Sequence, residues 1–410
     1  MRSIIIAAGF LFGLSTAIPT DLTGNLCVGE LLAVLLVPIA YIWINKSKYR
    51  GNVFTMVKCL FALSIWQMLI DGIHNTPFQK TLEIIGTLGF TGIKLLVFSG
   101  LFSKNGNFCG PVLAGMAVGN YIFLREFVTS SAIMEAEYWD LKVATWAGPL
   151  LLSGLIIFGR YSIAISMFAG IMYGCAAGYY GARSHGICII IGSITPWLIL
   201  VLKRTSMFGE MRSATKIISL AVVGIFLATF IYVESAKLGL LTRKSQEQIE
   251  TIENPYNPIQ IALSARGGTV LGVIGALEHP FIGFGSKEFY TDLYIEAGLP
   301  NNYGSIHSVI VESMAYGGIL TLLFWWIFFR NVFVMYPPTS RNHSELLYFN
   351  VVASIVVVLL LWSSCFSPFV SSRLDFPILI ATLLHCDLYR NSHLSNLQTI
   401  KQQEQLRHRS

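Results

Sequence analysis

Apolar residues come in long runs along this chain, and the runs recur about every 30 residues from one end to the other. Each run is long enough, or nearly so, to cross a bilayer as a helix of about 20 residues. The pattern therefore predicts an all-α, polytopic membrane protein with about twelve transmembrane helices. The expected spans are 4–19, 26–45, 52–70, 82–102, 108–124, 143–159, 161–180, 186–202, 217–233, 306–329, 346–366 and 374–388.

Composition excludes an ordinary soluble domain. Of the 410 residues, 54% are hydrophobic and only 12% are charged, whereas soluble domains carry about 25% charged residues. The net charge of +6 does not indicate nucleic-acid binding, because most basic residues lie at span edges, where they report topology. The seven cysteines lie mostly inside apolar runs and form no CxxC pair, so neither a disulfide framework nor a zinc site is indicated.

The charges flanking the runs predict the orientation of the chain. The first run is expected to be a signal-anchor helix rather than a cleaved signal, because eleven further spans follow and the cleavage pattern is poor. With the amino terminus placed inside, the larger share of the basic residues also falls inside, most clearly in the short loops 46–50 and 203–216. Both termini are expected to be cytoplasmic. The expected organisation is nine helices over 1–233, an outer loop over 234–305, three helices over 306–390 and a cytoplasmic tail over 391–410.

The outer loop 234–305 contains two recognisable elements. Helical spacing of apolar residues over 257–277 predicts a short amphipathic helix on the membrane surface, with Arg266 in its middle and a stop at His279-Pro280. A glycine-containing apolar turn over 281–285 follows. Any chemistry is therefore expected on the outer face.

His307 is expected in the first turn of the tenth span, with Ser305 as its cap. Unpaired N–H groups and the positive helix end favour an anion there and disfavour an imidazolium. A neutral histidine beside a phosphate is suited to act as a general base near neutral pH. The alternative is an interfacial polar residue with no role beyond capping.

Charged residues in or near spans raise a competing interpretation. Lys94, Asp71 and Glu312 are costly in lipid and should face protein or water. They would form a coupling relay if the chain were a twelve-span secondary transporter. Such proteins usually have two related halves and a central cytoplasmic loop, whereas this chain shows no repeat and its long loop lies late and outside. Arg373 with Asp375 is interpreted as a packing ion pair.

Three features together resemble the bacterial O-antigen ligases and the related O-antigen and exopolysaccharide polymerases. His307-Ser308 is followed by nine residues and then by Gly318-Ile319-Leu320-Thr321, which is similar to the ligase signature. The other two features are Arg266 followed by the Pro-Phe-Ile-Gly-Phe-Gly turn at 280–285, and Arg183-Ser184 at the outer end of a central span. The likeness covers the whole chain in topology and about 60 residues in motif. Two positions differ: Val270 replaces a leucine of the ligase pattern, and Tyr316 stands where relatives often carry an acid.

The resemblance implies a membrane glycosyltransferase with a GT-C-like fold in the bacterial inner membrane. Its members move a glycan from an undecaprenyl-diphosphate carrier to an acceptor hydroxyl, on lipid A core or on another glycan, with inversion, with no metal and with no cofactor. His307 would be the general base, and Arg266 and Arg183 would stabilise the diphosphate, as two parallel hydrogen bonds from a guanidinium allow. Arg125, Ser308 and Tyr303 are weaker candidates for substrate binding; Arg125 is equally well explained by an ion pair with Glu126.

Overall fold

The computed structural model describes residues 2–20, 26–130, 147–179, 183–204, 272–286, 308–336, 347–366 and 376–392, with a few single residues between them. These residues are almost wholly helical, and the described part holds no strand apart from one isolated bridge between Pro19 and Cys27. The all-α prediction is therefore confirmed for them. The helices are α1 (Arg2–Ser15), α2 (Val28–Asn45), α3 (Arg50–Ile73), α4 (Phe78–Lys104), η1 (Gly106–Phe108), α5 (Cys109–Ser130), α7 (Gly148–Gly159), α8 (Ile163–Tyr179), α9 (Arg183–Arg204), α14 (Val309–Gly317), α15 (Leu320–Val334) and α16 (Leu347–Phe366). A further helix covers 376–392.

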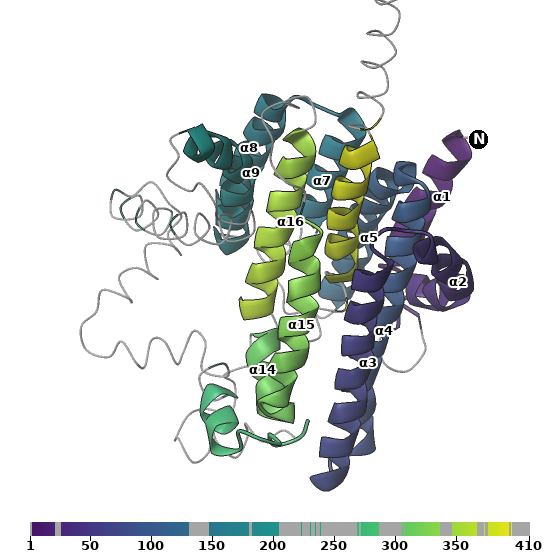
Figure 1. Ribbon diagram of the computed structural model, residues 1–410, viewed down its shortest axis with the longest axis vertical. Helices are drawn as coiled ribbons and strands as arrows, with labels where there is room; N and C mark the ends of the chain where they lie inside the picture. Colours follow the sequence, from purple (N-terminus) through teal and green to yellow (C-terminus); the bar gives the residue numbers. More distant parts are fainter. Residues whose placement is uncertain are drawn as a thin grey trace, which may run out of the picture.

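The helices form one bundle (Figure 1). Helices α1 to α5 pack on one side, with α1 against α5 and α4 against both α2 and α3; α8, α9 and α16 pack together on the other side. Four helices among the described residues, α2, α3, α4 and most of α16, are long and apolar enough to cross a membrane. Leucine, isoleucine and phenylalanine side chains on the outer faces of α2 and α3 are exposed, which suits a surface that meets lipid rather than water.

Glycines on α1 and α5 let the backbones of these two helices contact each other. A Cβ on Gly13 would lie 2.2 Å from the Val112 carbonyl oxygen, and one on Gly115 would lie 2.1 Å from that of Phe10. Small residues at such contacts let two membrane helices approach closely and gain van der Waals contact. Because Gly9 meets Pro111 and Gly119 meets Ala17, the two helices run parallel.

The helix expected over 306–329 is not continuous. It is divided into α14 and α15 at Gly318, whose φ of 73° lies in the left-handed region that favours glycine. The Trp325 indole N–H donates to the Ser313 hydroxyl over 2.9 Å, so the two helices fold back on each other as a hairpin. The prediction of one straight span was wrong here, because apolar spacing continues on both sides of the break.

Candidate functional site

The described part of the chain includes three of the six predicted site residues. His307, Arg266 and Tyr303 lie outside the described residues. Arg125 lies in the last turns of α5, Arg183 is the first residue of α9, and Ser308 is the residue before α14. The ends of α5 and α8, the start of α9 and the end of α16 lie at the end of the bundle opposite the start of α1, and Ser308 contacts α16 there.

Ser308 is the N-cap of α14. Its hydroxyl oxygen accepts from the Val311 N–H (3.3 Å) and donates to the Ser364 carbonyl (3.3 Å), and the residue is buried. The expected cap at Ser305 was wrong, because the helix begins two residues after His307 rather than around it. The Ser308 hydroxyl is committed to the helix start, and its contact with substrate stays a prediction.

The glycine-rich turn that follows the outer-loop helix is docked on the break between α14 and α15. The Phe284 and Gly285 N–H groups donate to the Ala315 and Tyr316 carbonyls, both over 2.9 Å. In return, the Ile319 N–H donates to the Pro280 carbonyl over 2.7 Å. The turn therefore satisfies carbonyls that the end of α14 leaves unpaired.

Glycines are required on both sides of this contact. Gly283 and Gly285 have φ values of 61° and 74°, which non-glycine residues seldom adopt. A Cβ on Gly318 would lie 2.2 Å from the Phe281 carbonyl oxygen, and one on Gly283 would lie 2.5 Å from the Tyr316 carbonyl carbon. The helix break and the turn thus fit each other through backbone alone, and we call this unit, residues 280–286 with 308–321, the docked turn.

Asp71 anchors the docked turn to α3. Its carboxylate accepts from the Ser286 N–H (2.6 Å), the Ser286 hydroxyl (2.7 Å) and the Gln67 side-chain amide (2.9 Å). Trp66, five residues earlier on α3, donates its indole N–H to the Gly317 carbonyl over 2.7 Å. Asp71 is only 2% exposed, so the prediction that it faces protein is confirmed.

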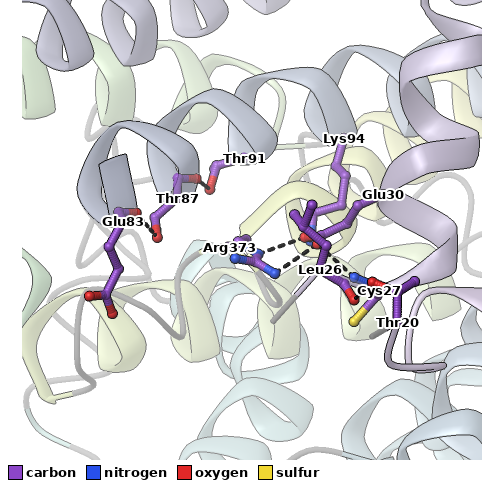
Figure 2. Close-up of polar contacts among 9 residues, drawn as sticks. All are labelled: Thr20, Leu26, Cys27, Glu30, Glu83, Thr87, Thr91, Lys94 and Arg373. Atoms are coloured by element: carbon purple, nitrogen blue, oxygen red, sulfur yellow. Dashed lines mark hydrogen bonds and ion pairs between the residues drawn. The ribbon is translucent and has the colours of Figure 1, made fainter. Parts of the chain in front are cut away.

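A second polar cluster joins α2, α4 and the segment before the last helix (Figure 2). Arg373 engages Glu30 with two parallel hydrogen bonds, Nε to Oε1 at 2.6 Å and a terminal nitrogen to Oε2 at 2.7 Å. The Lys94 ammonium lies 3.1 Å from Glu30 Oε1. The Cys27 N–H also donates to Glu30 Oε2 over 3.0 Å. Lys94 and Glu30 are both buried, which confirms that Lys94 faces protein.

Sequence reasoning missed Glu30. The available signal was a lone acid within an otherwise apolar run, and such residues in spans usually pair with another charge. Arg373 was assigned Asp375 as its partner; the structure gives it Glu30, and Asp375 lies outside the described residues.

Figure 2 also shows a stripe of polar side chains on α4 that leads to Lys94. The Thr87 hydroxyl donates to the Glu83 carbonyl (2.8 Å), and the Thr91 hydroxyl donates to the Thr87 carbonyl (2.6 Å). These hydroxyls are satisfied by their own helix and need no water. Lys94 and Asp71 bind different partners in separate networks, so the contacts do not favour the relay of a transporter.

A third cluster lies where the chain turns between α2 and α3. Asp387, on the last helix, accepts from the Lys48 ammonium (2.6 Å), the Asn391 amide (2.7 Å) and the Tyr49 hydroxyl. Burial, together with the hydrogen bond to Asp387, raises the pKa of Tyr49 above its ordinary value. The phenol therefore stays protonated as a donor, and the cluster links both halves of the bundle.

Among the described residues, no three His, Cys, Asp or Glu side chains gather as a metal ion would require. The seven cysteines are all free thiols. No family model, no curated protein and no solved structure matches the chain.

Proposed function

We propose that this protein is a membrane glycosyltransferase of the O-antigen ligase type. It would have about twelve transmembrane helices in a GT-C-like arrangement in the bacterial inner membrane, with both termini in the cytoplasm and the site facing the periplasm. It would transfer a glycan from undecaprenyl diphosphate to a hydroxyl of lipid A core or of another glycan.

The observation that carries this proposal is the docked turn. Two motifs that suggest the family, 280–285 and 307–321, are separate in sequence, yet they bind each other through backbone hydrogen bonds and glycine contacts. This explains why both need glycine at fixed positions. It also places the start of α14 beside the turn that ends the described helix over 272–278; that Arg266 and His307 extend this arrangement into a site is part of the proposal.

The proposed step needs charge stabilisation and one proton transfer. The acceptor oxygen forms a bond to the anomeric carbon while the bond from that carbon to the diphosphate oxygen breaks. His307 takes the acceptor proton, and Arg266 and Arg183 stabilise the charge that develops on the leaving diphosphate. Arg125, Tyr303 and Ser308 are assigned to donor or glycan contacts. The diphosphate is already a good leaving group, so guanidinium groups replace the metal in this scheme.

Reconstitution with a lipid-diphosphate glycan in EDTA tests the proposal. Transfer and release of undecaprenyl diphosphate are expected with the unaltered protein, and His307→Ala should lower the rate by about 10²–10⁴-fold at unchanged abundance. Arg266→Lys keeps the charge but loses the two-pronged contact, so it should lower transfer as well. Arg330→Gln, an exposed arginine in α15 outside the docked turn, is the control. Unaltered transfer by the His307 variant would refute its role.

The acceptor is tested by deleting the gene and examining surface glycans. Loss of a ligase leaves uncapped core, which is the expected outcome because the signature is of the ligase type. Loss of a polymerase leaves core capped with a single repeat, and this result would assign the chain to the polymerases of the same family.

A further inference from the structure

A cleft opens at the end of the bundle where α1 starts, far from the docked turn. Its enclosed part is small, about 40 Å³, and the rest is open to the surroundings. It lies between α1, α5, α7, α16 and the helix over 376–392, and its lining includes Ile6, Asn107, Phe158, Arg160 and His385. Nothing in the proposed glycan transfer uses it.

His385 forms a buried polar point in the cleft wall. The side chain is 1% exposed and packs near Phe102, Phe349 and Tyr389, with its ring centroid 4.6 Å from that of Tyr389. Its Nδ1 atom is buried and has no hydrogen-bond partner. Buried polar atoms in proteins are nearly always paired, and His385 is part of the cleft lining, so an occupant of the cleft is the candidate partner for this nitrogen.

Arg160 supplies a cation at the rim. It caps α7 in the left-handed conformation, with φ 50° and ψ 41°, where glycine is the usual residue and an arginine is strained. The residue is exposed. The ion pairs among the described residues involve other cations and not Arg160.

The cleft borders an exposed apolar face of α7. Leu151, Leu155 and Phe158 are 40%, 52% and 62% exposed and follow one face of this helix at helical spacing. Phe158 belongs both to this stripe and to the cleft lining. An occupant is therefore offered an apolar surface at the lip, a cation at the end of the helix and a buried nitrogen inside.

We propose that this cleft binds the phosphate headgroup of an anionic phospholipid. The Arg160 guanidinium engages the phosphate, His385 Nδ1 bonds a headgroup oxygen, and an acyl chain lies along Phe158 and Ile6. A guanidinium suits a phosphate because it offers parallel donors in a fixed plane. By the distribution of basic residues, this end of the bundle is the cytoplasmic one, where anionic lipids and cationic side chains attract each other. The site does not depend on the proposed glycan transfer.

The test uses the purified full-length protein in detergent, with phosphatidylglycerol, phosphatidylethanolamine or inorganic phosphate added. Native mass spectrometry counts retained lipid, and tryptophan fluorescence gives the unfolding temperature. Phosphatidylglycerol should be retained and should raise that temperature more than the other two. Arg160→Gln should weaken its binding roughly tenfold, as expected for the loss of a charge-assisted contact. Arg330→Gln, another exposed arginine, should bind as the unaltered protein does.

Two further variants separate lipid binding from folding. Arg160→Gly removes the cation but relieves the left-handed backbone, so the protein without lipid should be no less stable while lipid retention falls. His385→Phe removes the unpaired nitrogen at similar size, so it should keep the fold and reduce the gain from lipid. Equal lipid binding by the Arg160 and Arg330 variants would overturn the proposal, as would an equal gain from inorganic phosphate.

Discussion

Removing the Glu30 carboxylate charge should destabilise the bundle far more than removing the Lys94 ammonium. Glu30 is fully buried, and the side chains of Lys94 and Arg373 are 4% and 11% exposed. Glu30→Gln would leave two buried cations facing a neutral amide. Leaving a buried charge without its partner costs about 3–5 kcal/mol.

Lys94→Met is different, because the two-pronged contact between Arg373 and Glu30 survives. The lost attraction is offset by no longer burying an ammonium, and methionine fills a similar volume in an apolar environment. The expected change is within about 1 kcal/mol of zero. The Glu30→Gln/Lys94→Met double variant should be more stable than Glu30→Gln alone, because it removes one of the two cations that repel each other.

Thermal unfolding in detergent, followed by tryptophan fluorescence, measures the difference. Glu30→Gln should lower the unfolding temperature by roughly 5–15 °C, if 1 kcal/mol corresponds to a few degrees. Lys80→Met is a matched control, because Lys80 lies at the exposed start of the same helix and 3.9 Å from Glu83; it should change stability by no more than about 0.5 kcal/mol. Similar losses for the Glu30 and Lys94 variants would refute the reasoning, since the charge imbalance predicts a clear order.

The docked turn yields three further predictions. Gly318→Ala should cost at least about 2 kcal/mol and abolish glycan transfer, because the φ is positive and the new Cβ would meet the Phe281 carbonyl oxygen at 2.2 Å; transfer and unfolding temperature check this. Asp71→Asn should weaken the bonds to Ser286 and speed cleavage of the loop by protease before global unfolding, which a digestion time course would measure. Trp66→Phe removes one donor to a helix-end carbonyl and should cost about 1 kcal/mol in the same unfolding assay.

Helix positions were the part of the fold most open to prediction. The runs at 26–45, 52–70, 82–102 and 346–366 correspond to α2, α3, α4 and α16 within several residues. The membrane makes these positions predictable, because a spanning segment must pair its own backbone groups and expose apolar side chains over a fixed thickness. The cost of a charge in lipid also predicted that Lys94 and Asp71 face protein, and their burial confirms it.

The partners of the buried charges were not predictable in the same way. Glu30 and Arg373 are 343 residues apart, and neither apolar periodicity nor charge spacing connects them. An acid in the first turn of a helix also has a local explanation, because it suits the positive helix end. The meeting of His307, Arg266 and Arg183 stays a prediction for a related reason: it depends on tertiary contacts, and two of the three lie outside the described residues.

Gly318 belongs to the ligase-like motif, yet its role in the structure is to break the helix. Glycine is common in transmembrane helices, so its presence within an apolar run predicted no interruption. The break depends on the segment 280–285, which donates N–H groups to the end of α14 and accepts one from the start of α15. An α14 that ends without those donors would leave carbonyls unpaired, at a cost of about 1–3 kcal/mol each. The glycine that resembles a ligase signature therefore has a structural role that requires no substrate, and only variants that keep the docked turn while removing His307 or Arg266 can test the chemistry separately.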